Sequence, residues 1–312
     1  MQLIRGIKKL QSFDSGCVLT IGNFDGVHKG HSVVINKLAE KEKLLGLPVV
    51  VMVFEPQPLE FFLKDNAPSR LTRLREKIIH FKHLPVDNLL IVSFNQCFAN
   101  LDPKYFIQEI LVERLNVKYL VVGDDFHFGK ARRGNFALLQ EAGEQYSFKV
   151  IDTASYSVKG SRVSSTLIRD ALNNGDLATA ESMLGRSYSV CGRVVHGEKL
   201  GRKIGFPTAN IQMQRKNTPI QGVFAVTMTG IGEKPIFGVA NVGTKPTVDS
   251  RAQVLLETHL FDFDQDIYGK YVEVHFKYKI RSEMRFQSVD DLKRQIQLDT
   301  AQARTLMQQS KK

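Results

Sequence analysis

Residues 20–31 read Thr-Ile-Gly-Asn-Phe-Asp-Gly-Val-His-Lys-Gly-His, and the first half of the chain is organised around them. The apolar run 18–21 stops at Gly22, which is typical of a buried strand that ends in a turn. From about Gly30 the apolar residues follow a helical period, so the glycine-rich turn opens a helix. A helix N-terminus carries free N–H groups and partial positive charge, and both suit phosphate. The stretch therefore predicts a strand, a phosphate-binding turn and a helix.

Two histidines stand at the entrance of this predicted helix. His28 and His31 are three residues apart, so both rings can face one anion and stabilise charge that develops on a phosphorus. The alternative is that they only cap the turn. The segment resembles the His-x-Gly-His signature of nucleotidyltransferases, and the chain contains no P-loop motif. The predicted nucleotide- or phosphate-binding residues of the turn are Gly22, Asn23, Phe24, Gly26 and Gly30.

Composition limits the class of protein. A length of 312 residues favours two domains, and a hydrophobic fraction of 43% is ample for two cores. No apolar stretch reaches about 18 residues and no signal-peptide core stands at the N-terminus, so we expect no membrane segment. Cys17, Cys97 and Cys191 form neither a metal-ligand spacing nor a disulfide framework, which indicates a reducing cytoplasm. The oligomeric state is left open.

The net charge of +11 favours anionic partners, either nucleic acid or small polyphosphates. Basic residues are dispersed, apart from short clusters such as residues 130–133. Because a nucleic-acid-binding protein usually concentrates its basic residues and its aromatics, and this chain lacks tryptophan, we expect no nucleic-acid partner.

The first half alternates strand-like and helix-like segments. Such alternation implies a parallel sheet with helices on both faces, where ligands bind beyond the carboxyl ends of the strands. Gly22 and Gly123 both lie at such ends, which suggests one shared site. The further strands are expected at 48–54, 89–94, 117–122 and 148–151, with helices from Ser69 as N-cap to Phe81 and from Asp102-Pro103 onward.

Two later segments fit the same site. Residues 123–130 leave a strand and carry Asp125 among aromatics, with arginines just beyond. Ser164, Ser165 and Thr166 begin a helix, and Arg169 follows one turn on. Hydroxyls and amides there can hold phosphate oxygens, while Arg169 can neutralise a departing pyrophosphate. The alternative is a simple N-cap.

After about residue 184 the pattern changes to short alternating strands, as in an antiparallel barrel or sandwich, which places the domain boundary near residue 185. A final amphipathic helix is expected over 288–307.

Residues 197–210 form a glycine-rich loop whose amides and cations suit phosphates, although a turn-rich connection between strands is the alternative. Thr208 and Asn210 offer oxygens on one side of an extended segment, of the kind that Mg²⁺ requires. The predicted phosphate-binding residues of the loop are Gly197, Lys199, Gly201, Arg202 and Gly205.

Glu257 lies in an otherwise apolar strand, where a carboxylate is costly unless it is paired or used. It could take a proton from an alcohol that attacks the γ-phosphorus of ATP. An ordinary outward-facing glutamate is the alternative.

Together these motifs resemble the bifunctional bacterial riboflavin kinase / FAD synthetase family over nearly the whole chain. The stretches that carry the resemblance are Gly-Asn-Phe-Asp-Gly-Val-His-Lys-Gly-His (22–31), Val-Ser-Ser-Thr-Leu-Ile-Arg (163–169), Gly-Phe-Pro-Thr-Ala-Asn (205–210) and Glu-Thr-His (257–259). The resemblance implies a nucleotidyltransferase-like (Rossmann-like) α/β domain over 1–185, and a β-barrel kinase domain with a C-terminal helix over 186–312.

It also implies two reactions. The barrel would transfer the γ-phosphoryl of ATP to riboflavin, with Glu257 as base, Thr208 and Asn210 binding Mg²⁺–nucleotide, and Arg281 near the flavin. The first half would transfer AMP from a second ATP to FMN, giving FAD and pyrophosphate, with His28 and His31 at the phosphorus. Asp125, Ser164, Thr166 and Arg169 would surround the nucleotide and phosphates.

One position departs from the family pattern. Many members have Pro-His-Pro where this chain has Pro-Gln-Pro at 56–58. Gln57 cannot be protonated but can donate a hydrogen bond, so we expect a modest change in FAD synthesis. A competing hypothesis keeps the nucleotidyltransferase and makes the barrel a non-catalytic regulatory module.

Overall fold

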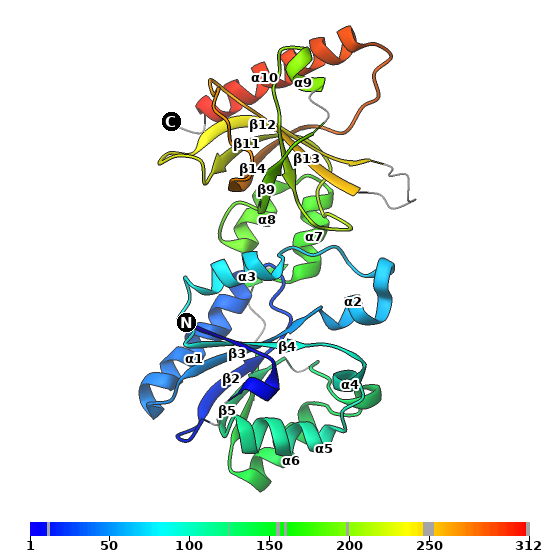
Figure 1. The fold of residues 1–312 in the computed structure, drawn as a ribbon. Coiled ribbons are helices and arrows are strands. Elements are labelled where there is room, and N and C mark those ends of the chain that lie inside the picture. The colour runs from blue at the N-terminus through cyan, green and yellow to red at the C-terminus, as the bar shows by residue number, and fades with distance from the viewer. Residues whose placement is uncertain are drawn as a thin grey trace. The chain divides into compact units, whose positions relative to one another are not determined.

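The computed structural model describes residues 1–10, 13–123, 125–153, 157–158, 161–197, 200–245 and 253–309 (Figure 1). The chain divides into two compact units. The first contains Met1–Pro68 and Thr72–Val163, and the second contains Ser69–Leu71 and Ser164–Lys312.

The first unit is built on a six-stranded parallel sheet in the order β1-β4-β3-β2-β5-β6. The central strands are near-continuous apolar runs because both faces of a parallel sheet are buried. The predicted parallel α/β fold is confirmed. The strands are β1 (Gln2–Arg5), β2 (Cys17–Ile21), β3 (Val49–Glu55), β4 (Asn88–Ser93), β5 (Val117–Val122) and β6 (Lys149–Asp152), and a hairpin of β7 (Ser157–Val158) and β8 (Ser161–Arg162) follows.

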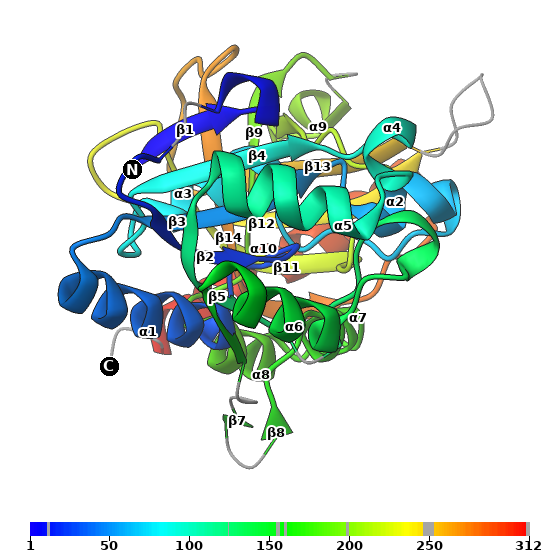
Figure 2. The ribbon, with the colours of Figure 1, turned by 90° about the horizontal axis from the view of Figure 1, so that it is seen from below.

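Helices cover both faces of this sheet. Along β3, Val50 and Met52 pack with the helical residues 106–115 and with α6, while Val51 and Val53 pack on the opposite side with residues of α1 and α3. Figure 2 shows α5 and α6 lying over one face of the sheet. The helices are α1 (Lys29–Leu45), α2 (Pro58–Leu63), α3 (Leu74–Phe81), α4 (Gln96–Ala99), α5 (Pro103–Tyr105), which continues as a π-helix over Phe106–Arg114, and α6 (Phe136–Tyr146).

One predicted boundary is wrong. The helix expected from Ser69 begins at Leu74, with Arg73 at the N-cap position. Ser69 is not a cap because residues 69–71 belong to the second unit, where side chains from that unit bind their backbone carbonyls. The periodic pattern of apolar residues does not reveal such hydrogen bonds to residues that are distant in sequence.

The second unit is a closed antiparallel barrel in the order β10-β13-β12-β11-β14-β9, so the choice between barrel and sandwich is settled as a barrel. The sequence predicts the short strand β10 only as an extended segment. The elements are α7 (Ser165–Asn173), α8 (Leu177–Leu184), β9 (Ser189–Val195), α9 (Leu200–Lys203), β10 (Ala209–Gln212), β11 (Gly222–Thr229), β12 (Ile236–Lys245), β13 (Gln253–Leu260), β14 (Tyr271–Arg281) and α10 (Val289–Gln309).

Phe224 and Phe276 are fully buried in the barrel and meet edge to face, with ring centroids 5.3 Å apart. Neighbouring positions on the opposite strand face, including Val223 and Val239, pack against Ala303 of α10. The predicted C-terminal helix is thus confirmed, and it covers one side of the barrel.

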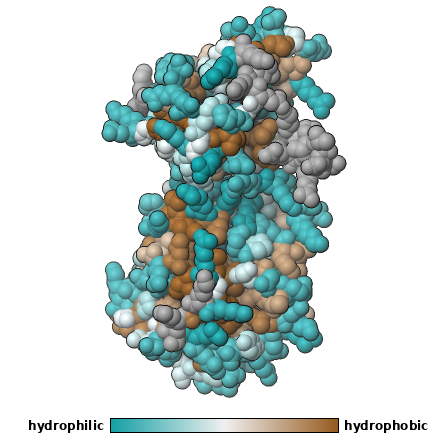
Figure 3. All heavy atoms as spheres, in the orientation of Figure 1, coloured by the Kyte–Doolittle hydropathy of each residue, from teal (hydrophilic) through white to brown (hydrophobic). Residues whose placement is uncertain are grey.

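Hydrophilic side chains cover most of the face of the molecule that Figure 3 shows, and hydrophobic patches interrupt them. Within the described ranges, no helix has the length and apolar character that a membrane crossing needs.

Candidate active sites

The loop between β2 and α1 has an unusual backbone. Phe24 and Val27 have φ angles of 46° and 41°, and both side chains are buried. Positive φ is uncommon outside glycine and persists only where the surroundings enforce it, often at functional sites. Gly26, with φ of 86°, donates its N–H to Thr72 Oγ1 at 2.9 Å. The loop therefore has a single strained shape that other parts of the first unit hold in place.

His28 and His31 stack at the start of α1, with ring centroids 3.6 Å apart. Each Nδ1 accepts the backbone N–H of the other histidine at 3.3 Å. Because Nδ1 accepts, the neutral form of each ring carries its proton on Nε2. A Cβ at Gly30 would lie 3.1 Å from the His28 ring, so only glycine fits there without displacing it. The histidines cap the helix, and the same contacts make each Nε2–H a donor.

Two side chains that sequence reasoning missed support this loop. Asp25 accepts hydrogen bonds from the N–H and Oγ1 of Thr72, at 3.0 and 3.3 Å. Lys77 is completely buried and donates from Nζ to the Asn23 carbonyl at 2.6 Å. A signal existed for Lys77, because it lies three residues after Leu74, on the apolar stripe of α3. A cation on a core-facing stripe indicates an internal partner.

Gly123 lies at the carboxyl end of β5, which pairs in parallel with β2, so the loops that follow the two strands leave the same edge of the sheet. This confirms that Gly22 and Gly123 share one edge. Asp125 is exposed there, and a Cβ at Gly123 would lie 2.7 Å from its Oδ1.

An aromatic surface that the sequence did not suggest follows β3 and β4 at this edge. Phe62 on α2 is 60% exposed and packs against Phe94, with ring centroids 5.7 Å apart. Leu59 and Leu63 of the same helix are also exposed. Exposed apolar side chains in one short helix indicate a surface that an apolar ligand can cover.

The predicted hydroxyl segment begins α7 in the second unit. Ser164 is the N-cap and accepts the Leu167 N–H at 3.2 Å, as the N-cap alternative anticipated. Thr166 is exposed on the first turn. Arg169 donates from Nε to the Ser69 carbonyl at 2.6 Å. Ser165 is the first residue of the helix.

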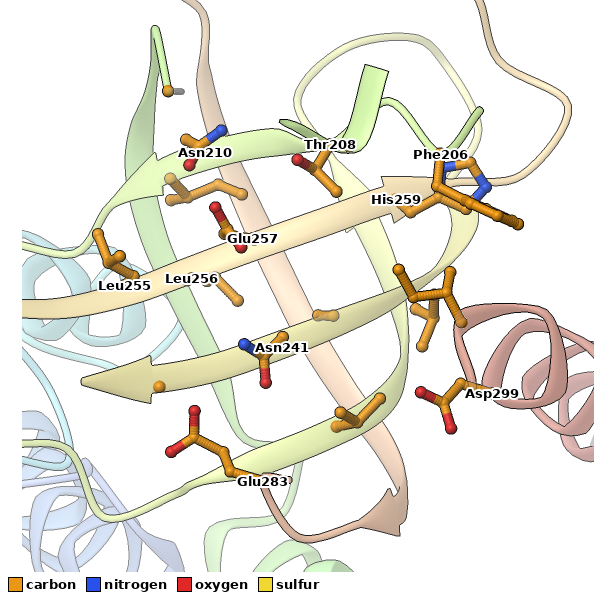
Figure 4. A pocket seen from close by; sticks show the side chains of 18 of the residues that line it. Phe206, Thr208, Asn210, Asn241, Leu255, Leu256, Glu257, His259, Glu283 and Asp299 are labelled. Carbon is orange, nitrogen blue, oxygen red and sulfur yellow. The ribbon is translucent and has the colours of Figure 1, made fainter. Parts of the chain in front are cut away.

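The barrel unit contains a pocket of about 640 Å³ between the outer face of its strands and α10 (Figure 4). On β13, Leu256 and Thr258 are buried, whereas Glu257 and His259 point outward into this pocket. Glu257 is therefore an outward-facing strand residue that nevertheless lies in a cavity.

Glu257 stands in the middle of a row of three polar side chains. Strand register pairs it with Asn210 of β10 on one side and with Asn241 of β12 on the other. Directly paired residues point to the same face, and Figure 4 shows the three side chains along the pocket floor. Gly197 lies against the Asn210 amide, where a larger residue would displace it.

Thr208 also lines the pocket, on the turn that leads into β10. Gly201 contacts this turn, with the Thr208 Oγ1 3.3 Å from the place of a Cβ. His259 Nδ1 lies 2.9 Å from the Pro207 carbonyl. Because a carbonyl only accepts, Nδ1 is the donor and joins this turn to β13.

Of the remaining predicted residues, Arg202 and Gly205 are exposed and do not line the pocket, and Lys199 lies outside the described residues. Arg281 does line the pocket, but its guanidinium binds Asp299 of α10, with NH2 2.7 Å from Oδ2. A single pocket wall thus includes parts of β14 and α10.

Among the residues that the structure describes, no group of three or more His, Cys, Asp or Glu could hold a metal ion.

Two known protein families match this chain, one in each half, in the same order as the motifs. The sequence model of FAD synthetase matches residues 10–167, and that of riboflavin kinase matches residues 184–307. The chain belongs to the bifunctional riboflavin kinase/FMN adenylyltransferase family. Both predicted transferase activities, with ATP as co-substrate, are those of this family.

Curated relatives match along nearly their whole length. The bifunctional riboflavin kinase/FMN adenylyltransferase of Escherichia coli (strain K12) is 52% identical over 97% of each chain. Those of Haemophilus influenzae and Pseudomonas fluorescens are 50% and 45% identical over at least 97% of each chain. A crystal structure titled as a macrolide-efflux protein from Streptococcus pneumoniae shares the fold, with a TM-score of 0.80 and 29% identity over 96% of this chain and 97% of that one.

Proposed function

We propose that the pocket of the barrel unit transfers the γ-phosphoryl group of ATP to the 5′-hydroxyl of riboflavin, with Glu257 as the general base. The observation that carries this proposal is the position of Glu257 between Asn210 and Asn241 on the floor of a pocket of about 640 Å³. Such a volume suits a small-molecule substrate. The flanking amides can orient the carboxylate and the substrate hydroxyl for proton transfer.

Mg²⁺ is the proposed metal of this pocket. Thr208 and Asn210 supply neutral oxygens, the hard donors that Mg²⁺ accepts together with nucleotide phosphates. The bound ion would neutralise charge on the phosphates. The glycine-rich loop with Gly197, Gly201, Arg202 and Gly205 would approach the same phosphates, and Arg281 the flavin.

For the first half we propose transfer of AMP from ATP to FMN at the loop before α1. The Nε2–H groups of His28 and His31, together with the N–H groups of the helix start, would stabilise negative charge on the transferring phosphate. Phe62 and the apolar side chains beside it would receive the flavin ring. The proposed roles around the nucleotide stay with Asp125, Ser164, Thr166 and Arg169. We propose that the two catalytic halves divide near residue 185. We also propose that the enzyme is cytoplasmic.

The test is to supply purified protein with Mg²⁺–ATP and either riboflavin or FMN, and to separate the flavin products by chromatography. We expect E257Q to slow FMN formation by about 100-fold or more, the usual contribution of a general base, and to leave FAD formation from supplied FMN unchanged. H28N and H31N should show the reverse pattern.

E273Q is the matched control, because Glu273 is a half-buried strand glutamate of the same barrel that binds Ser189, outside the pocket. It should phosphorylate riboflavin within about twofold of the unaltered rate. Normal FMN formation by E257Q would overturn the assignment of the base and return the barrel to a non-catalytic role.

A further inference from the structure

Residues 69–72, the crossing segment, lie between α2 and α3 in the chain but do not all belong to the first unit. Ser69–Leu71 group with the second unit, and Thr72 returns to the first. Leu71 is fully buried. The chain thus leaves the first unit for three residues. The residue that follows them, Thr72, supports the loop before α1.

Two arginines of the second unit hold the crossing segment by its backbone. Arg169 donates from Nε to the Ser69 carbonyl at 2.6 Å. Arg215, only 9% exposed, donates from NH1 to the Arg70 and Leu71 carbonyls at 3.1 and 3.4 Å. Hydrogen bonds from a cation are stronger than neutral ones. Three successive carbonyls are therefore held by charged donors.

The next residue carries this restraint into the first unit. Thr72 binds Asp25 through its N–H and accepts the Gly26 N–H at its Oγ1. Asp25 and Gly26 lie between Phe24 and Val27, the two non-glycine residues of this loop that have positive φ. A strained loop keeps its shape only while its supports do. Because Leu71 and Thr72 share a peptide bond, fixing the Leu71 carbonyl limits where Thr72 can place its N–H.

We propose that Arg215, a residue of the riboflavin kinase half, is a positioning residue for FMN adenylylation. In this proposal it acts through other residues and not on a reacting atom. It holds residues 70 and 71, these orient Thr72, and Thr72 sets the backbone of the loop that presents His28 and His31. The inference rests on the proposed assignment of that loop to adenylyl transfer. Displacing a catalytic group by about 1 Å can cost on the order of 100-fold in rate, so a distant support has a measurable effect.

The test uses the full chain with the substitution R215M, which keeps the length and removes the donors. We expect the kcat for FAD formation from FMN to fall about tenfold, within the range that misplacement of a catalytic group can cause, while riboflavin phosphorylation by the same protein stays within about twofold. R215K keeps one cationic donor and should fall between R215M and the unaltered protein. A change in kcat with little change in KM separates positioning from substrate binding.

Y188F is the matched control, because it removes the Tyr188 hydroxyl that accepts from the same Arg215 NH1 at 2.8 Å and leaves the Arg215 donors and the carbonyls of the crossing segment in place. Its FAD formation should stay within about twofold of normal. If Y188F and R215M lose both activities equally, Arg215 serves only barrel stability and the proposal is wrong.

A double-mutant cycle with T72V gives the sharper result. If Arg215 acts through Thr72, R215M/T72V should be no more than about twofold slower than the slower single variant, because both weaken the support that Thr72 gives to the loop before α1. Rate losses that multiply, or an unchanged rate in R215M, would overturn the proposal. H28N and H31N distinguish its failure from failure of the site assignment: if they leave FAD formation intact, the loop itself is not the adenylylation site.

Discussion

The ion pair between Arg281 of β14 and Asp299 of α10 gives a prediction whose size follows from the contacts. Arg281 Nε lies 2.9 and 3.1 Å from the two carboxylate oxygens, and NH2 lies 2.7 Å from Oδ2. Asp299 is only 3% exposed, and its other described donor is the Gln295 amide at 2.9 Å. The substitution R281M therefore leaves a buried carboxylate with one neutral donor.

Removing one partner of a buried ion pair costs about 3–5 kcal/mol, because the remaining charge stays desolvated. We expect this cost to fall on the docking of α10, since Asp299 belongs to that helix. At 1.36 kcal/mol per factor of ten, backbone amides protected by this docking should exchange about 150- to 5,000-fold faster. R281M/D299L replaces both charges with apolar groups and should recover most of the protection.

The assay is hydrogen exchange followed by mass spectrometry on peptides that cover Val289–Gln309. R304M is the matched control. Arg304 also lies on α10 and pairs with Asp262, but both side chains of this pair are well exposed. Such a surface pair contributes little to stability because solvent screens it, so exchange should rise less than about tenfold. Equal effects of R281M and R304M, or a double variant that exchanges faster than R281M, would refute the reasoning. D299N separates the two roles of Arg281, because a direct flavin contact would survive in that variant and the ion pair would not.

Three further predictions concern stability and reactivity. Burial lowers the pKa of His275 below its usual 6.5, against the opposing effect of Glu273. The unfolded chain therefore binds more protons than the folded one, so stability should fall on going from about pH 8 to about pH 5. H275Q should flatten this change, measured as the melting temperature. Burial raises the pKa of Cys17 to about 12, so a thiol reagent should modify exposed Cys97 in the native protein and leave Cys17 unmodified until denaturation. F224A should destabilise the barrel by about 3–5 kcal/mol, measured as earlier heat loss of kinase activity than of adenylyl transfer.

Much of the fold could be read from local pattern. The strands of the parallel sheet are apolar runs bounded by turns, and the barrel strands alternate, so their positions follow from which residues must avoid water. The entrance of α1 follows equally from Gly22, the spacing of the two histidines and the helical period after them. These features need information only from residues close in sequence.

The sites needed more. The sequence left Glu257 open as an ordinary surface residue, and only strand pairing placed it between Asn210 and Asn241. No sequence pattern links Arg281 to its partner Asp299. The sequence predicts Ser69 as a helix cap, whereas in the structure its carbonyl binds Arg169.

The sequence by itself therefore determined the two kinds of sheet, the order of the motifs and the family. The tertiary structure alone decided which side chains share a pocket, which carbonyls the arginines bind and where α3 begins. The physical reason is that burial patterns are local and repeat along the chain. Register, ion pairs and hydrogen bonds to distant carbonyls depend on contacts between residues that are far apart in sequence, and no local spacing encodes those contacts.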